Sequence, residues 1–178
     1  MIDPLIQAVL GAALAVLFAA AAAHKLRSGA RFAAQLAEYR LLPAAIVSPA
    51  AWALAAVELM VAAALLMSVT RPFAAIAAAG LLAGYGLAIA INLARGRRYI
   101  DCGCGDTRQL LSPWLLVRNG LLAGGAILVA LPAEARVAGW AEVVVGCVAF
   151  VVLVLTYLAA EKLLENASVL REWRESHG

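Results

Sequence analysis

Five apolar stretches dominate this sequence, and each is long enough to cross a lipid bilayer as a helix. They cover residues 4–23, 49–69, 72–94, 113–131 and 137–160. A bilayer has a hydrocarbon core about 30 Å thick, which a helix crosses in about 20 residues. Lipid offers no hydrogen-bond partner to an open backbone, so segments of this kind must be helical. The pattern predicts an all-α integral membrane protein whose environment is the lipid bilayer.

Composition leaves no room for a second, soluble domain. Apolar residues make up 65% of the 178 residues, whereas a typical soluble domain has roughly 45–50%. We therefore expect residues 1–178 to form one transmembrane domain. It would contain four core transmembrane helices, a fifth transmembrane helix and one interfacial amphipathic helix. We expect no nucleic-acid partner, and the composition leaves the oligomeric state open.

Three of the stretches begin with a short polar residue followed by proline. These pairs are Asp3-Pro4, Ser48-Pro49 and Ser112-Pro113. A short polar side chain suits the N-cap, and proline suits the first helical position because its missing amide hydrogen would have no intrahelical partner. The sequence therefore predicts a helix start at each pair. A secretory signal would begin with basic residues, but the only charged residue in the first stretch is Asp3, so we expect this stretch to be retained.

The segment 28–42 has the pattern of a short amphipathic helix. Its apolar stripe is formed by Phe32, Leu36 and Tyr39, and Pro43 ends it. The segment also carries Arg31, Gln35 and Glu38. Such a helix is too polar to cross the membrane and is suited to its interface. The alternative, which we favour, is a connector that packs on the end of the bundle.

Glu58 lies near the middle of the second stretch, where a carboxylate costs about 2.5–3.5 kcal/mol without a partner. Arg118 is a suitable partner, and Lys25 and His24 approach from the same side of the membrane. The pair is either a structural ion pair or part of a proton or cofactor site. Both alternatives stay open at this point.

Two other features of the spans concern packing. The pentapeptide Gly-Leu-Leu-Ala-Gly occurs at 80–84 and again at 120–124. Small residues four apart let helices approach closely, so we expect both to be packing seams between helices, with oligomer contacts as the alternative. Cys147 in the fifth stretch is expected to be an inert, buried thiol.

The longest polar interruption, residues 95–106, contains Cys102-Gly103-Cys104. A disulfide needs α-carbons about 4.4–6.8 Å apart, which residues i and i+2 reach only in a bent backbone that Gly103 permits. The small ring would be strained, and strained disulfides exchange readily. The pair therefore favours a redox-active dithiol over a structural disulfide.

Charged residues around the cysteines are expected to tune the thiolates or to dock a partner. They are Arg95, Arg97, Arg98, Asp101 and Arg108. The main alternative is a zinc or copper site in which the two thiolates are joined by His24 or Asp101. We predict redox chemistry and no metal, and a pair with neither role is the remaining alternative, because two cysteines alone are a signal of moderate specificity.

Several of these motifs together resemble the methylamine-utilisation MauE family, whose members are similar to DoxX-type membrane proteins. The resemblance rests on Lys25, Phe32, Tyr39-Arg40-Leu41-Leu42-Pro43, Glu58, Asn92-Leu93-Ala94-Arg95-Gly96-Arg97, Asp101-Cys102-Gly103-Cys104 and Arg118-Asn119. It implies a membrane redox partner of a periplasmic thioredoxin-like protein, called MauD in methylamine utilisers. Together they would support disulfide formation in the small subunit of methylamine dehydrogenase. A non-catalytic assembly factor for the same client is the alternative.

The same resemblance extends by analogy to quinone-linked thiol oxidases, namely DsbB and vitamin K epoxide reductase. It implies that electrons pass from Cys102 and Cys104 to a membrane acceptor such as a quinone. The polar side chains expected to contact the quinone or relay its protons are Glu58, Asn92, Arg118 and Asn119.

Charge distribution and family resemblance predict opposite membrane orientations. If five spans alternate, one face carries most of the basic residues, namely Lys25, Arg27, Arg31, Arg40, Arg95, Arg97, Arg98, Arg108, Lys162, Arg171 and Arg174. The other face carries only Arg71 and Arg136. The positive-inside rule then predicts a cytoplasmic Cys-Gly-Cys loop. The resemblance implies the periplasmic side of a bacterial inner membrane, and that is the orientation we adopt.

Overall fold

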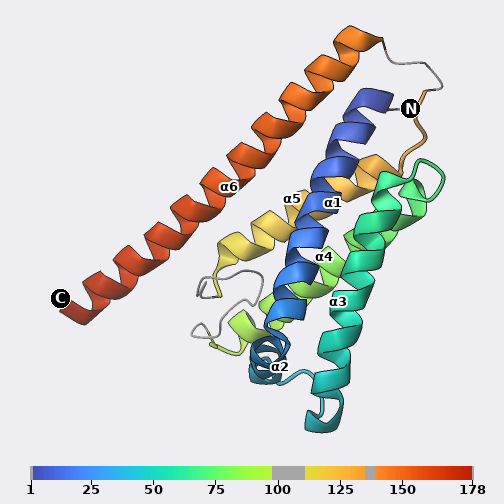
Figure 1. The fold of residues 1–178 in the computed structure, drawn as a ribbon. Coiled ribbons are helices and arrows are strands. Elements are labelled where there is room, and N and C mark those ends of the chain that lie inside the picture. Colours follow the sequence, from blue (N-terminus) through green and yellow to red (C-terminus); the bar gives the residue numbers. More distant parts are fainter. Residues whose placement is uncertain (1, 98–110, 135–138, 178) are drawn as a thin grey trace.

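The computed structural model describes residues 2–97, 111–134 and 139–177. Within these ranges the chain forms six α-helices (Figure 1). They are α1 (Pro4–Arg27), α2 (Gly29–Glu38), α3 (Ala44–Leu66), α4 (Arg71–Ala94), α5 (Pro113–Ala130) and α6 (Trp140–His177).

All helices except α2 are long and apolar enough to cross a membrane, which confirms the predicted all-α membrane fold. Helices α1, α3, α4 and α5 form the bundle, and α6 lies on its outside (Figure 1). The closest helix pairs are α4 with α5 and α1 with α3, whereas α6 packs mainly on α1. The predicted bundle of four core helices, with a fifth transmembrane helix beside it, is therefore present. Helix α2 lies at the end of the bundle away from the N-terminus. The last turn of α4 and the first turn of α5 lie at the same end.

The predicted helix starts are correct at two of the three proline pairs. Asp3 caps α1, because its Oδ1 accepts a hydrogen bond from the Leu5 amide at 2.8 Å. Ser112 is the N-cap of α5. The prediction for Pro49 is wrong, since α3 starts five residues earlier at Ala44 and contains Pro49. Pro43 has the extended backbone of an N-cap, so the chain enters the helix there.

Polar side chains satisfy backbone carbonyls at the end of the bundle near the N-terminus. The Gln7 amide on α1 donates to the carbonyls of Val129 and Leu131 at the end of α5. Arg71 Nε donates to the Leu65 carbonyl at the end of α3, at 3.0 Å. The last carbonyls of a helix lack intrahelical partners, and in lipid an unsatisfied carbonyl is costly. These contacts fix the helix ends relative to one another.

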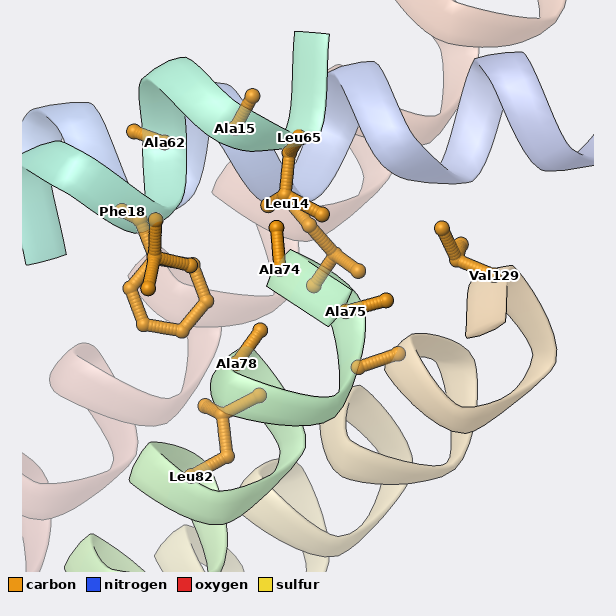
Figure 2. Close-up of a cluster of buried hydrophobic side chains, with 12 residues drawn as sticks. Leu14, Ala15, Phe18, Ala62, Leu65, Ala74, Ala75, Ala78, Leu82 and Val129 are labelled. Atoms are coloured by element: carbon orange, nitrogen blue, oxygen red, sulfur yellow. The ribbon is translucent and has the colours of Figure 1, made fainter. Parts of the chain in front are cut away.

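Alanine lets the helices of the core approach closely. The main cluster joins α1, α3, α4 and α5 (Figure 2) and places Phe18 and Leu65 among small residues. Ala75, Ala78 and Ala126 are fully buried there. Helix pairing between apolar surfaces in lipid depends on such close packing, because lipid tails are as apolar as the helices.

The two Gly-Leu-Leu-Ala-Gly segments do not form packing seams within the chain, so that prediction is wrong. Gly80, Gly84, Gly120 and Gly124 are exposed, and a Cβ added at any of them would meet no atom within 4 Å. The buried alanines on the opposite helix faces form the seams instead. Cys147 is exposed at the protein surface on α6, in a stretch apolar enough to cross the membrane, and its inertness stays a prediction.

Helix α2 packs its apolar side on the bundle, which is the connector arrangement. Phe32 and Tyr39 are buried, and the helix contacts α3 more than any other element. Gly29 lets α2 approach α3 closely, because a Cβ at this position would lie 3.1 Å from the Trp52 ring on α3. The helix thus covers the end of the bundle at which α4 ends and α5 begins.

Candidate functional site

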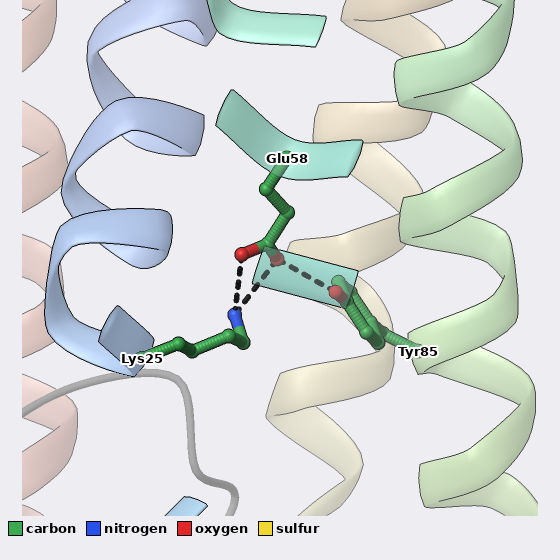
Figure 3. Close-up of polar contacts among 3 residues, drawn as sticks. All are labelled: Lys25, Glu58 and Tyr85. Carbon is green, nitrogen blue, oxygen red and sulfur yellow. Dashed lines mark hydrogen bonds and ion pairs between the residues drawn. The ribbon is translucent and has the colours of Figure 1, made fainter. Parts of the chain in front are cut away.

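A buried ion pair and a tyrosine hydroxyl connect three helices near α2. Lys25 Nζ on α1 donates hydrogen bonds to Glu58 Oε1 and Oε2 on α3, at 2.7 and 2.8 Å (Figure 3). The Tyr85 hydroxyl on α4 donates to Glu58 Oε1 at 2.6 Å. The carboxylate therefore accepts hydrogen bonds from two other helices. We call Lys25, Glu58 and Tyr85 the buried triad.

Burial makes this pairing energetically important. Lys25 is 4% exposed and Glu58 is 1% exposed. Removing one partner of a buried pair leaves an uncompensated charge, at a cost of about 3–5 kcal/mol. Lys25 Nζ also lies 5.1 Å from the Phe32 ring centroid and 5.5 Å from that of Tyr85, within range of cation–π attraction.

Of the partners predicted for Glu58, Arg118 does not contact it, whereas Lys25 does. Arg118 on α5 instead forms a 2.8 Å ion pair with Glu161 on α6. Lys25 reaches Glu58 because α1 and α3 lie side by side along their lengths. The sequence analysis did not single out Tyr85, although a tyrosine within an otherwise apolar span is a signal for a buried hydroxyl that needs a partner.

A cavity of about 70 Å³ lies beside the triad. Lys25 and Tyr85 line it, whereas Glu58 does not. The other lining residues come mostly from α2 and α4, namely Phe32, Gln35, Leu36, Tyr39, Leu41, Leu54, Ala88 and Ile89. Helix α2 thus forms one wall of a small, largely apolar and aromatic space.

The two asparagines predicted to share a site with Glu58 are buried but make no hydrogen bond to it. Asn92 Nδ2 donates to the Ala88 carbonyl at 3.0 Å, while Asn92 Oδ1 and Asn119 Nδ2 have no hydrogen-bond partner among the described residues. Asn119 lies against Gly86, where an added Cβ would be 3.8 Å from its Cβ. Both side chains are therefore held within the bundle, away from the cavity lining.

The start of the cysteine-bearing segment is fixed by the end of α4. The Gly96 amide donates to the Leu93 carbonyl and the Arg97 amide donates to the Asn92 carbonyl, both at 3.0 Å. Gly96 has φ +72°. This is a Schellman motif, in which glycine takes the left-handed position after the helix. It sets the direction in which the chain leaves α4.

The end of the same segment is fixed by packing on the cavity walls. Leu111 is buried in a cluster with Tyr39, Ile89 and Leu115, and Tyr39 and Ile89 also line the cavity. The segment is therefore anchored by the end of α4 on one side and by Tyr39 and Ile89 on the other.

The predicted redox pair itself, Cys102 and Cys104, lies outside the described residues, as do Arg98, Asp101 and Arg108. Arg95 is exposed and Arg97 is half-buried at the start of the segment. Among the described residues, no group of three or more His, Cys, Asp or Glu side chains is placed to hold a metal ion.

Comparison with known proteins identifies the family. The model of the family described as Methylamine utilisation protein MauE matches residues 3–132, well over half of the chain. The chain belongs to the MauE family. It is 42% identical to the Methylamine utilization protein MauE of Paracoccus versutus over 90% of this chain and 88% of that protein. It is 37% identical to the MauE protein of Paracoccus denitrificans over 92% of this chain and 89% of that protein. No solved structure gives a significant match.

Three of the MauE relatives align with about nine-tenths of the chain. The MauE protein of Methylophilus methylotrophus is 36% identical over 91% of this chain and 87% of its own length. The alignments therefore include most of the helices described above, and the chain has about the length of its MauE relatives.

Proposed function

We propose that this chain is a membrane thiol–disulfide redox protein of methylamine utilisation, with Cys102 and Cys104 as its redox pair. The name shared by its relatives supports a role in methylamine utilisation. The pair of cysteines one residue apart supports the chemistry, because an exposed or strained disulfide is the exchange-competent kind.

The observation that carries this proposal is the way both ends of the cysteine-bearing segment are held. The Schellman motif at Gly96 fixes one end, and the burial of Leu111 against Tyr39 and Ile89 fixes the other. The residues on either side of the segment, Arg97 and Leu111, therefore have defined places on the bundle. A reactive site benefits from such a rigid support.

The proposed exchange is chemically balanced. A thiolate of a thioredoxin-like partner attacks one sulfur of the Cys102–Cys104 disulfide and forms a mixed disulfide. The second partner thiol then displaces the remaining thiol of this chain. The partner leaves oxidised, and Cys102 and Cys104 have gained two electrons and two protons.

The exposed arginines at this end of the bundle fit the role of docking or thiolate-tuning groups. Arg95 follows α4 directly, and Arg27, Arg31 and Arg40 surround α2. Positive charge near a cysteine lowers the free energy of its thiolate. We further propose that this end faces the periplasm of a bacterial inner membrane, where a thioredoxin-like partner of the MauD type would meet it.

Differential thiol labelling tests the redox pair. In the purified full chain we expect two thiols that become accessible to a mass-tagged maleimide only after reduction. Cys102→Ser should leave one thiol of this pair permanently accessible and should trap the partner as a mixed disulfide.

Cys147→Ser is the matched control, since Cys147 is an exposed cysteine of the same chain on α6. It should leave the two-thiol cycle unchanged. If a Cys102→Ser, Cys104→Ser variant still supports maturation of the client, the chain is a non-catalytic assembly factor and the redox proposal is wrong.

A further inference from the structure

We propose that the α2 end of the bundle binds the phosphate of an anionic phospholipid through the exposed guanidinium groups of Arg27 and Arg31. The site would select lipids with a net negative headgroup, such as phosphatidylglycerol, over zwitterionic lipids. This inference is independent of the thiol chemistry proposed above. It assigns Arg27 and Arg31 to lipid and leaves Arg40 and Arg95 to a protein partner.

Two exposed tryptophans mark the membrane interface at the α2 end of the bundle (Figure 1). Trp52 on α3 is 54% exposed, and Trp114 in the first turn of α5 is 56% exposed. Both lie on helices that are apolar enough to cross a membrane. Tryptophan is enriched where the hydrocarbon meets the headgroups, so we expect the bilayer surface at the level of these two rings.

Arg27 and Arg31 lie beside one of these rings. Gly29 is midway between them in the sequence and packs against Trp52, because an added Cβ would be 3.1 Å from the ring. Two residues of chain span at most about 7 Å. The α-carbons of both arginines are therefore within about 7 Å of the Gly29 α-carbon, at the depth of the headgroup layer.

Both guanidinium groups are available to a ligand. Arg27 and Arg31 are exposed, and neither has an acidic partner among the described residues. Glu38, the acidic residue of α2, is about 10 Å from Arg31 along the helix axis. A guanidinium can donate two hydrogen bonds to one phosphate. Each basic residue near an anionic membrane surface raises the affinity about fivefold.

The apolar surroundings of these arginines favour a lipid over an acidic protein as the ligand. Leu26, next to Arg27, is 41% exposed, and Trp52 is more than half exposed. A water-soluble protein that bound the arginines would also have to cover this apolar surface. A phospholipid offers its phosphate to the arginines and its acyl chains to Leu26 and Trp52 at the same time.

The opposite end of the bundle lacks such a pair of arginines in the part of the chain that the structure describes. Its basic residue, Arg71, donates from Nε to the Leu65 carbonyl at 3.0 Å and from Nη2 to the Leu66 carbonyl at 3.5 Å. This guanidinium therefore caps the end of α3. The proposed selection thus acts in one membrane leaflet, the one that α2 meets, whichever way the chain is oriented.

Quenching of tryptophan fluorescence by brominated lipids tests the site in a bilayer. The full chain with Trp114→Phe, Trp140→Phe and Trp173→Phe keeps Trp52 as its only tryptophan. It is reconstituted into vesicles of phosphatidylglycerol and phosphatidylcholine, in which one lipid or the other carries bromine on its acyl chains. We expect phosphatidylglycerol to bind beside Trp52 about tenfold more tightly than phosphatidylcholine, or more tightly still.

The matched variants change one charge pattern at a time. Arg27→Gln, Arg31→Gln should abolish the preference for phosphatidylglycerol. Arg95→Gln is the control, because it removes an exposed arginine at the same end that follows α4 and does not flank Gly29. It should keep the preference. Arg31→Gln alone should lower the preference about fivefold, and this result tests the site even if the double variant does not fold.

Several outcomes would overturn the proposal. Equal quenching of Trp52 by the two brominated lipids would show that no selective site exists. Loss of the preference in Arg95→Gln, as complete as in the double variant, would show a diffuse attraction. Competition by an excess of inorganic phosphate would make free phosphate the ligand. If Arg27→Gln, Arg31→Gln keeps the preference but slows exchange with a thioredoxin-like partner, these arginines dock a protein. None of these outcomes depends on whether Cys102 and Cys104 cycle.

Discussion

Lys25 and Glu58 form an ion pair in which one ammonium group contacts both carboxylate oxygens, at 2.7 and 2.8 Å, between the end of α1 and the middle of α3. The sequence separation of 33 residues means that the pair connects two membrane-spanning helices. It also sets the position of the Tyr85 hydroxyl, which donates to the same carboxylate.

The first prediction concerns this pair. Lys25→Met should lower the free energy of unfolding by about 3–5 kcal/mol, because it leaves the Glu58 carboxylate buried and unpaired. A Lys25→Met, Glu58→Gln double variant should recover most of that loss, since no uncompensated charge remains. Unfolding in detergent, followed by circular dichroism, measures both. Equal stability of the two variants would show that the unpaired Glu58 carboxylate carries no cost.

The second prediction concerns Tyr85. Tyr85→Phe removes one hydrogen bond to a charged group and should cost about 1.5–3 kcal/mol. The same change in a Glu58→Gln background should cost less, because the acceptor is then neutral. A double-mutant cycle on unfolding free energies gives the difference. A cost independent of the residue at position 58 would contradict the 2.6 Å contact.

The third prediction concerns the start of the cysteine-bearing segment. Gly96 has φ +72°, and a left-handed backbone costs a residue with a side chain about 1–2 kcal/mol. Gly96→Ala should therefore loosen the Schellman motif and slow reduction of the Cys102–Cys104 pair by the partner. Gly84→Ala, at an exposed helical glycine, is the control and should leave the rate unchanged. Identical rates for both variants would show that this anchor does not position the thiols.

The fourth prediction concerns membrane orientation. If all five candidate spans cross the membrane, the start of α1 lies on one side, and α2, the end of α4 and the end of α6 lie on the other. A reporter active only in the periplasm, fused after Gly178, should be active if the proposed orientation is correct. The exposed arginines near α2 would instead favour the cytoplasm under the positive-inside rule. An active cytoplasmic reporter at the same site would overturn the orientation and with it the periplasmic partner.

The fold was largely predictable because membrane insertion depends on local composition. Each span needs only enough consecutive apolar residues, so its existence can be predicted from its own sequence. The start of α3 was missed because two prolines, Pro43 and Pro49, both suit a helix start. Tertiary context decided between them.

The candidate site was only partly predictable. Glu58 was identified because a carboxylate in an apolar span needs a partner, but its partner depends on which helices are neighbours. Arg118 satisfies the same rule and pairs with Glu161 on α6. The glycine segments were misassigned for a similar reason, because sequence spacing does not tell which face of a helix points inward.

The sequence by itself determined the membrane environment, the number of spans and the presence of paired cysteines between two of them. These depend on hydropathy and on residue spacing, which are local properties. Only the tertiary structure decided that Lys25 is the partner of Glu58, that Tyr85 joins them, and that α2 forms a cavity wall beside them. The contacts of Glu58 with Lys25 and Tyr85 join residues 27 or more positions apart, and side-chain contacts at that separation are set by how the helices pack together.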